Sequence, residues 1–191
     1  MVLTETPKTE TDLIQQAQAG DTWAFGELVR HHYEPVVNVA YRICGEKSLA
    51  EDMAQETFLR AWTNLHSFRL TGSMKNWLYR IAVNVTLDTL RRKSEMSMDD
   101  EVVQMIQDPM PNPENSLIQK ERSENLQDML RALPLATRNV LVLREYGELS
   151  YHEIAAILDI PIGTVMSRLN YARTRLHDLL KDQPSMQEAY A

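Results

Sequence analysis

The sequence predicts an all-α protein: two small helical domains joined by a flexible acidic linker, with a helix-turn-helix in the second domain. Apolar residues recur at steps of three and four along most of the chain, and no stretch alternates apolar with polar residues as a half-buried strand would. Only six glycines and eight prolines interrupt the 191 residues. Three of those prolines lie with a run of carboxylates between two helical blocks, which places the linker there.

Composition along the chain gives the domain boundaries. We expect a first domain over residues 1–94, a linker over 95–122, a helix-turn-helix domain over 123–181 and a tail over 182–191. The linker sequence "SEMSMDDEVVQMIQDPMPNPEN" shows little apolar periodicity, so it is not expected to bury a core. The first nine residues resemble the tail in composition and are expected to be loose.

Charge is unevenly distributed about a net value of −7. Residues 1–68 carry −5, residues 69–93 carry +5, residues 94–128 carry −7, and residues 129–191 are neutral. Positive charge supplies most of the affinity of proteins for DNA, so the whole chain has the wrong sign for a protein that binds DNA by itself. The basic segment inside an acidic chain is therefore a candidate for contact with nucleic acid.

Three long helices are expected in the first domain. Asp21 is placed to cap a helix that continues past Pro35 to about residue 44. Ser48 is the expected cap of "LAEDMAQETFLRAWTNL", and Ser73 that of "MKNWLYRIAVNVTLDTLRRK". Each has apolar residues at helical spacing, which predicts that the helices pack against one another.

The second domain contains the strongest motif, "LSYHEIAAILDIPIGTVMSRL". It follows two amphipathic helices, "NSLIQKERSENLQDMLRALP" and "LATRNVLVLREYG", the latter stopped by Gly147. Ser150 with Glu153 is typical of a capping box, and the sequence at Asp159–Pro161 ends that helix before the next begins. This pattern predicts a helix-turn-helix, whose second helix usually lies in the major groove; a helical hairpin with an ordinary solvated face is the alternative.

Two surfaces of the first domain differ in character. In "SFRLTGSMKNWLYRIAVNVTLDTLRRK", aromatic and basic residues are interleaved, which suits a single strand whose phosphates need cations and whose bases can stack. Trp77 and Tyr79 are alternatively part of the core. The preceding helix presents Glu51, Asp52 and Glu56 near Trp62, and such a face repels DNA and favours a basic protein partner.

Other classes of function are disfavoured. The five histidines do not pair with cysteine or carboxylate at ligand spacing along the chain, and the adjacent His31 and His32 are expected to point in different directions, so no metal site is predicted. There is no phosphate-binding glycine loop or nucleophile elbow, so neither an enzyme nor a cofactor is expected. A single cysteine, Cys44, and the lack of a membrane-spanning or signal segment predict a cytoplasmic protein.

Over about residues 11–180 the sequence resembles bacterial RNA polymerase sigma factors of the extracytoplasmic-function (group IV) type, within the sigma-70 family. The resemblance is carried by "AEDMAQETFLRAW", "NWLYRIAVN" and the helix-turn-helix motif, in this order. It implies a non-catalytic initiation subunit that binds core RNA polymerase and reads −10 and −35 promoter elements. It also implies that the linker runs through the RNA exit channel, and that an anti-sigma factor, which can hold the protein at the membrane, is a partner.

The resemblance implies a role for three sets of residues. Those that would bind the clamp helices of the polymerase β′ subunit are Asp52, Gln55, Glu56, Thr57, Phe58 and Trp62. Those that would open and hold the −10 element are Phe68, Arg69, Ser73, Lys75, Trp77, Arg80, Asn84, Arg91 and Arg92. Those that would read the −35 duplex, in a motif over 150–170 that also touches the β flap, are Thr164, Met166, Ser167, Arg168, Tyr171 and Arg175.

Met166 departs from many members of this group, which have a basic residue there. A thioether donates no hydrogen bond to a guanine edge, although it can contact a thymine methyl. No −35 sequence is therefore carried over to this chain. The main rival interpretation is a stand-alone helix-turn-helix regulator, which would bind duplex DNA specifically without polymerase.

Overall fold

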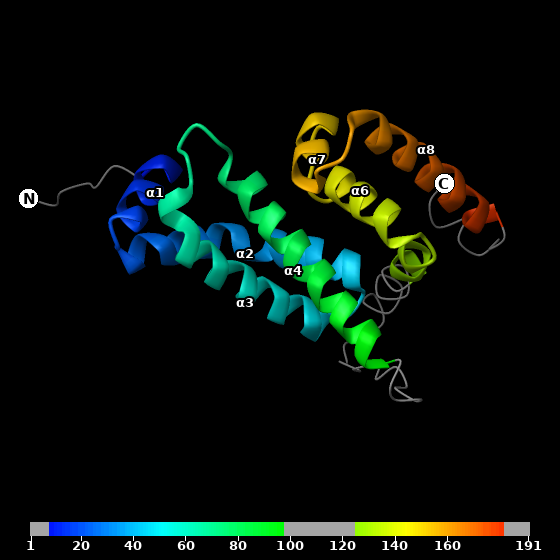
Figure 1. The fold of residues 1–191 in the computed structure, drawn as a ribbon, viewed down its shortest axis with the longest axis horizontal. Coiled ribbons are helices and arrows are strands. Elements are labelled where there is room, and N and C mark those ends of the chain that lie inside the picture. Colours follow the sequence, from blue (N-terminus) through cyan, green and yellow to red (C-terminus); the bar gives the residue numbers. More distant parts are fainter. Residues whose placement is uncertain (1–7, 98–124, 182–191) are drawn as a thin grey trace, which may run out of the picture.

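The structure, a computed structural model, describes residues 8–97 and 125–181. Within these two ranges every regular element is helical, which confirms the predicted fold class. The α-helices, shown in Figure 1, are α1 (Glu10–Gln18), α2 (Thr22–Cys44), α3 (Lys47–Asn64), α4 (Met74–Ser97), α6 (Leu135–Glu145), α7 (Tyr151–Leu158) and α8 (Ile162–Lys181). A 3₁₀ turn, Leu65–Ser67, follows α3, and residues 125–131 are helical. Most of the predicted linker lies outside the described residues.

The first domain is a bundle of α2, α3 and α4, with α1 packed across the start of α2 (Figure 1). Its core is built from one apolar face of each long helix, including the fully buried Leu28, Ile43 and Leu78. Small residues such as Ala54 and Ala61, both with no exposed surface, allow α3 to approach its neighbours closely. The helical spacing of apolar residues is therefore the pattern that assembles this bundle.

The ends of these helices test the predicted caps. Asp21 caps α2 by accepting hydrogen bonds from the backbone N–H of Trp23 and Ala24, and the Ser73 hydroxyl accepts from that of Asn76 at the start of α4. The prediction for Ser48 is wrong: α3 begins at Lys47 after Glu46, whose side chain makes no cap. Because Ser48 lies inside the helix, the backbone N–H groups that follow it by two or three residues already donate to carbonyls of the helix, and its hydroxyl has none to cap.

Helix α1 was not predicted. Thr9 and Asp12 form a complete capping box, in which each side chain accepts from the backbone N–H of the other. The expected loose segment over residues 1–9 thus ends in an ordered helix cap. The Thr-x-x-Asp pattern was the signal that a helix starts here, although aspartate replaces the usual glutamate or glutamine.

The second domain confirms the helix-turn-helix. Ser150 and Glu153 form the predicted capping box at the start of α7, and Asp159 ends that helix in a left-handed conformation with φ of 52°. The two helices of the motif then pack through Ile154, Val165 and Leu169, which are buried. Left-handed backbone at a helix end is where asparagine, aspartate and glycine are best tolerated, so Asp159 suits this turn.

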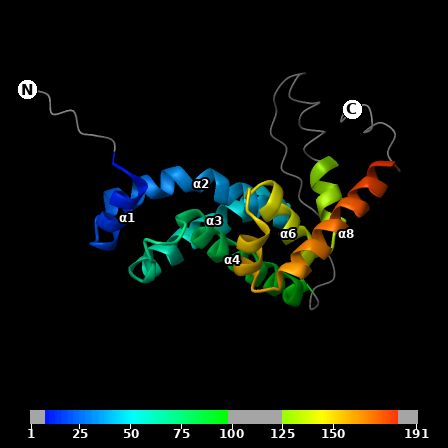
Figure 2. The ribbon, with the colours of Figure 1, turned by 90° about the horizontal axis from the view of Figure 1, so that it is seen from above.

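The two domains pack against each other rather than standing apart. Helix α7 contacts α4, and α6 contacts α2, as Figure 2 shows from above. The buried apolar residues of both domains join in one cluster, which extends from Ile43 in α2 to Leu130 and Leu133 beside α6. The sequence predicted two domains and a linker, but no pattern in it indicated this contact.

Gly147 offers a test of local packing. A β-carbon there would lie 2.6 Å from the carbonyl oxygen of Leu143, so we expect Gly147→Ala to lower the free energy of unfolding by about 1–3 kcal/mol. Gly26 is the matched control, because it lies within α2 and a β-carbon would meet nothing within 4 Å. Gly26→Ala should raise the same free energy by roughly 0.5–1 kcal/mol. Urea denaturation followed by circular dichroism checks both values, and a Gly147→Ala protein as stable as the wild type would contradict the expectation.

Candidate polymerase and promoter interfaces

The basic face of the first domain lies on α4. Arg80 and Asn84 are exposed and one turn apart, so they share one side of the helix. The side-chain amide of Asn84 makes no hydrogen bond with any described residue. At the far end, Arg91 and Arg92 are exposed, and Arg91 pairs with Asp88 at 3.0 Å. The helix therefore presents cations and a free amide along one surface, as a negatively charged strand requires.

Two aromatic residues of the set predicted to hold the −10 strand pack beneath the exposed surface of α4. The rings of Phe68 and Trp77 pack at a centroid distance of 5.2 Å, and Phe68 is buried. Trp77 is half-buried against the apolar cluster, and Tyr79 is fully buried. Phe68 therefore leaves little surface for a strand to contact, and its predicted role in holding the −10 strand stays a prediction. Composition alone did not separate aromatic residues of the core from those on the surface.

The remaining residues of the predicted −10 set lie in the loop before α4 and in the first turn of that helix. Arg69 and Ser73 are exposed, and Ser73 is also the helix cap described above. Lys75 is half-buried, and its ammonium lies 3.7 Å from a carboxylate oxygen of Glu148 in the second domain. Most of the predicted −10 residues therefore lie on one side of the first domain, whereas Lys75 is paired with the second domain.

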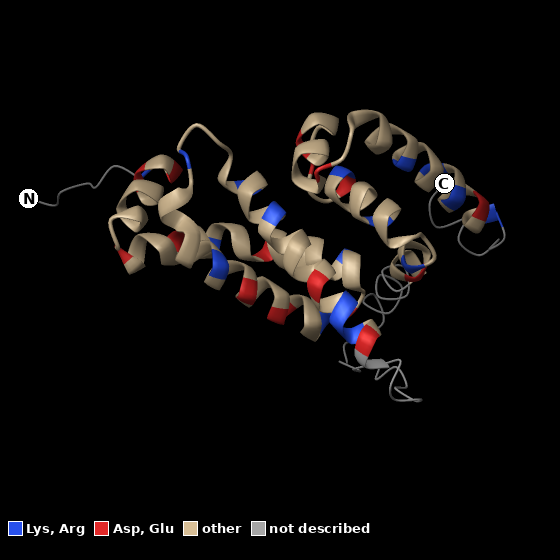
Figure 3. Cartoon of the chain, viewed as in Figure 1, with Lys and Arg blue, Asp and Glu red and all other residues tan. Residues whose placement is uncertain are grey.

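Helix α3 carries the acidic surface, which Figure 3 shows along its outer side. Asp52 and Gln55 are exposed, and Asp52 has no ionic partner among the described residues. Glu56 forms an i,i+4 ion pair with Arg60 at 2.7 Å. Trp62 is 36 % exposed and packs against Phe25 at 4.8 Å. Carboxylates thus lie beside an exposed apolar group, which is the composition of a protein-binding surface rather than a DNA-binding one.

Two members of the predicted polymerase-binding set are buried in the bundle. Thr57 and Phe58 are buried, and the Thr57 hydroxyl donates to the carbonyl of Met53 within the helix. They face the bundle core because they lie on the same side of α3 as Ala54 and Ala61. Leu59, in contrast, is 63 % exposed beside the predicted residues and was not included. The helical phase of α3 was the signal that separates the two groups.

The second basic surface is on α8. Thr164, Arg168 and Arg175 lie along one side, and the guanidinium of Arg168 makes no hydrogen bond or ion pair with any described residue. Met166 and Tyr171 are 54 % and 51 % exposed, which is unusual for large apolar side chains. Ser167 is exposed, and its hydroxyl donates to the carbonyl of Thr164. All six predicted −35 residues therefore lie at or near the surface of the helix that follows the turn.

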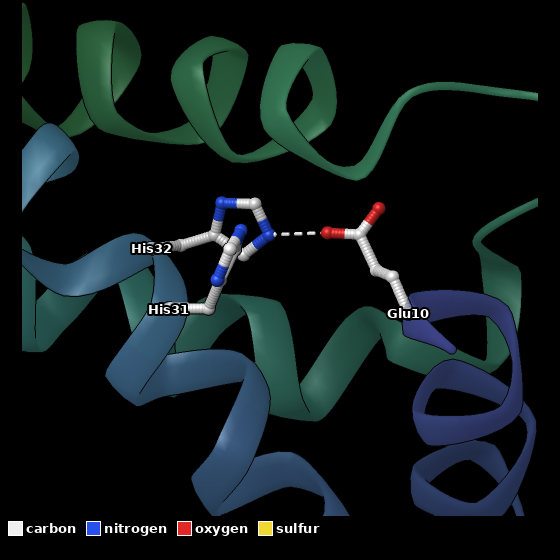
Figure 4. Close-up of side chains that lie close together, drawn as sticks. All are labelled: Glu10, His31 and His32. Carbon is white, nitrogen blue, oxygen red and sulfur yellow. Dashed lines mark hydrogen bonds and ion pairs between the residues drawn. The ribbon is translucent and has the colours of Figure 1, made fainter. Parts of the chain in front are cut away.

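A cluster of possible metal ligands lies apart from these surfaces. Figure 4 shows Glu10 accepting a hydrogen bond from His32 at 2.7 Å, with His31 beside them. Their donor atoms lie within 4.8 Å of one another. Burial lowers the pKa of His32, although Glu10 opposes the shift. The pocket beside the cluster is lined by the cations Lys8 and Arg30 and by the carboxylates Glu10 and Glu27, and Arg30 is paired with Glu27. Spacing along the chain missed this cluster because Glu10 comes from another helix.

Among residues 8–97 and 125–181, no helix has the length and apolar character that crossing a membrane requires.

Comparison with known proteins identifies the family. Residues 28–95 match Sigma-70 region 2, and residues 123–176 match Sigma-70 region 4. The chain is 37 % identical over 179 residues to the ECF RNA polymerase sigma factor SigW of Bacillus subtilis, covering 88 % of this chain and 95 % of that protein. It is 34 % identical over 185 residues to the ECF RNA polymerase sigma-E factor of Escherichia coli, covering 92 % and 95 %.

Two solved structures have the same fold. CnrH, in complex with the cytosolic domain of CnrY, matches with a TM-score of 0.69 and 26 % identity, covering 91 % of this chain and 98 % of that one. RpoE of Bartonella quintana, in complex with the anti-sigma factor NepR, matches with a TM-score of 0.69 and 25 % identity, covering 83 % and 98 %. The chain belongs to the extracytoplasmic-function sigma factors of the sigma-70 family, and it is an alternative sigma factor that directs RNA polymerase to promoters.

Proposed function

We propose that this sigma factor divides initiation among three surfaces. The exposed acidic and apolar side of α3, with Asp52, Gln55 and Trp62, binds the clamp helices of core RNA polymerase. The exposed side of α4, with Arg80 and Asn84, holds the opened −10 strand. The outer side of α8 reads the −35 duplex. The proposal rests on the separation of charge in the first domain, where α3 has an acidic exposed face and α4 a basic one. The acidic face suits a basic protein partner and the basic face suits a nucleic acid, so one bundle is able to bind both at once.

We propose further that the chain supplies no catalytic chemistry and works in the cytoplasm as a subunit of polymerase. A net charge of −7 suits this role, because a factor carried to DNA by polymerase needs little affinity of its own for non-specific sites. An anti-sigma factor is the expected regulatory partner, since CnrH and RpoE were solved with CnrY and NepR. The stand-alone regulator is not favoured, because it gives no role to the region 2 match.

The decisive test is transcription with purified core polymerase and a library of promoter sequences. We expect the chain to select promoters that share a −10 and a −35 element, and the chain without polymerase to show little specific binding to the same duplexes in a gel shift. Transcription starts that do not depend on the added chain would overturn the proposal. Specific duplex binding by the chain alone at physiological salt would favour the rival regulator.

Asn84 provides a finer test. Its free amide on the exposed side of α4 is suited to hydrogen bonding with an unpaired base, so Asn84→Ala should slow promoter opening by roughly 10-fold or more, the cost of about 1.4 kcal/mol. Binding to core polymerase should be unchanged. Permanganate footprinting measures opening, and a native gel measures polymerase binding. Asn38→Ala, at an exposed position on α2, is the matched control. Equal losses of opening and of polymerase binding would count against the assigned role.

A further inference from the structure

A carboxylate and two imidazoles from different helices meet in the first domain. Glu10, at the start of α1, lies against His31 and His32 of α2, as Figure 4 shows. One carboxylate oxygen of Glu10 is 2.7 Å from Nε2 of His32. One possible ligand atom from each of the three residues lies within 4.8 Å of the other two. None of the surfaces proposed above for polymerase or promoter DNA includes these residues, so the cluster needs an explanation of its own.

The two histidines lie closer together than their positions on the helix suggest. Successive side chains of an α-helix diverge by about 100°, which predicts that the two rings point apart. Instead, the rings of His31 and His32 contact each other edge to face, with their centroids 4.9 Å apart. His32 is buried and His31 is exposed. One imidazole is therefore held in place by packing, while the other is able to turn towards it.

The spacing of these groups suits a zinc ion after small rotations of two side chains. Zinc binds histidine nitrogen and carboxylate oxygen at about 2.0–2.2 Å, so two ligand atoms of a tetrahedral site lie about 3.3 Å apart. The Glu10 oxygen and His32 Nε2 are slightly too close at 2.7 Å, and ligand atoms 4.8 Å apart are too distant. Because Glu10 and His31 are both exposed, their side chains can make these adjustments without disturbing the core.

The charges around the cluster are balanced. Two cations, Lys8 and Arg30, and two carboxylates, Glu10 and Glu27, line the pocket beside it. Arg30 is paired with Glu27, which leaves the Glu10 carboxylate to the histidines. Lys75 of α4 also acts on the cluster, but its ammonium is paired with the second domain. The pocket is neutral in sum, so it presents no net repulsion to a bound cation.

We propose that Glu10, His31 and His32 bind a zinc ion, which fastens α1 to α2. Three protein ligands leave the fourth position of a tetrahedral site to water. Imidazole together with carboxylate suits zinc, whereas magnesium and calcium prefer oxygen ligands alone. The inference does not rest on the roles proposed for α3, α4 and α8, because zinc binding is measured on the free chain without polymerase or DNA.

A zinc ion at this place also supports the loop before α4. Helix α1 is only nine residues long, and its last residue, Gln18, reaches the end of the 3₁₀ turn. The side-chain amide of Gln18 donates to the carbonyls of Leu65 at 2.9 Å and of Phe68 at 2.8 Å. Those carbonyls come directly before the loop that carries Arg69 and Ser73. Fixing the first turn of α1 to α2 therefore steadies the start of that loop.

Calorimetric titration of the full chain with zinc chloride tests the site, in protein from which any histidine tag has been removed. We expect one zinc ion per chain and no binding of magnesium chloride. Glu10→Gln keeps the size of the side chain but removes the carboxylate, and His31→Ala removes an exposed ligand without leaving a core cavity. Each should weaken zinc binding at least about tenfold, since losing a group that merely orients a ligand already costs roughly 10- to 100-fold.

His152→Ala is the matched control, because His152 is an exposed histidine on α7, outside the cluster. This variant should bind zinc as tightly as the wild type. A wild-type chain that binds no zinc, or a cluster variant that keeps full affinity, would overturn the inference. Equal losses in His31→Ala and His152→Ala would overturn it as well, because they would mean that zinc binds surface histidines without selection.

Thermal unfolding distinguishes a metal site from a plain hydrogen bond between Glu10 and His32. Zinc at about 100 times its dissociation constant should raise the Tm of the wild type by roughly 5–10 °C. The same concentration should raise the Tm of Glu10→Gln by no more than about half as much. Zinc should also slow hydrogen exchange in α1 and in residues 65–73 of the wild type. An equal rise of Tm in both proteins, or unchanged exchange in α1, would contradict a zinc ion that joins α1 to α2.

Discussion

Replacing Asp52 and Glu56 by lysine is expected to weaken binding of the chain to core RNA polymerase by about 30-fold, which corresponds to roughly 2 kcal/mol for charged hydrogen bonds lost at an interface. Asp52 is exposed without an ionic partner among the described residues, so its carboxylate is available to a basic surface. Glu56 is partly committed to Arg60. All activity of a sigma factor depends on polymerase binding, so promoter-directed transcription should fall with it.

The change has a small structural cost that must be measured separately. Lysine at position 56 lies one turn before Arg60, and such a like-charge pair destabilises a helix by about 0.2–0.5 kcal/mol. Thermal unfolding of each variant reports that cost. Competition between labelled wild-type and unlabelled variant chains for core polymerase reports the interface, and Glu34→Lys with Glu95→Lys, both at exposed positions on other helices, controls for net charge. Full affinity in the Asp52 and Glu56 variant would show that polymerase binds elsewhere.

The apolar part of the same surface refines this expectation. Leu59 exposes 63 % of its surface beside Trp62, and exposed large apolar groups near charged ones are typical of protein interfaces. Hot spots usually combine a desolvated aromatic anchor with a ring of polar contacts. If α3 binds polymerase, Trp62→Ala should therefore cost at least as much affinity as the two charge reversals, although part of that cost comes from losing the contact with Phe25.

Local patterns predicted most of the fold because its helices are specified locally. The apolar periodicity of the long helices and the caps at Asp21, Ser73 and Ser150 are short-range features, and each placed a helix start correctly. The same reasoning failed at Ser48, a good capping residue that is the second residue of the helix. A capping residue shows where a helix is able to start, while packing of the whole bundle decides where it does start.

Contacts between distant segments were not predictable from spacing. Asn76 meets Glu153 across 77 residues, and Glu10 meets His32 across 22. Neither pair has a sequence pattern, because both depend on how whole helices pack. The buried members of the predicted sites, Thr57 and Phe58, are a different case. The helical spacing of α3 predicts that both side chains point into the bundle. They were included because they belong to the motif, whose letters do not say which way each side chain points.

Met166 gives the second large expected effect, a change of promoter preference. It is 54 % exposed in the second turn of α8, where residues of a recognition helix reach base edges. A thioether discriminates among bases weakly, whereas arginine binds the O6 and N7 of guanine through two hydrogen bonds. Met166→Arg is therefore expected to favour guanine at one −35 position by about 1–3 kcal/mol, or roughly 5- to 150-fold.

The measurement is transcription from a library in which the −35 element is randomised and the −10 element is fixed. Thr174→Arg is the control, because it adds the same charge to an exposed position on α8 two turns further from the turn of the motif. Added charge alone strengthens phosphate contacts for every sequence, so the control should raise activity without a base preference. A guanine preference found only with Met166→Arg would show that the start of α8 contacts the bases of the −35 element. Equal, sequence-independent gains in both variants would mean that this part of the helix contacts only phosphates.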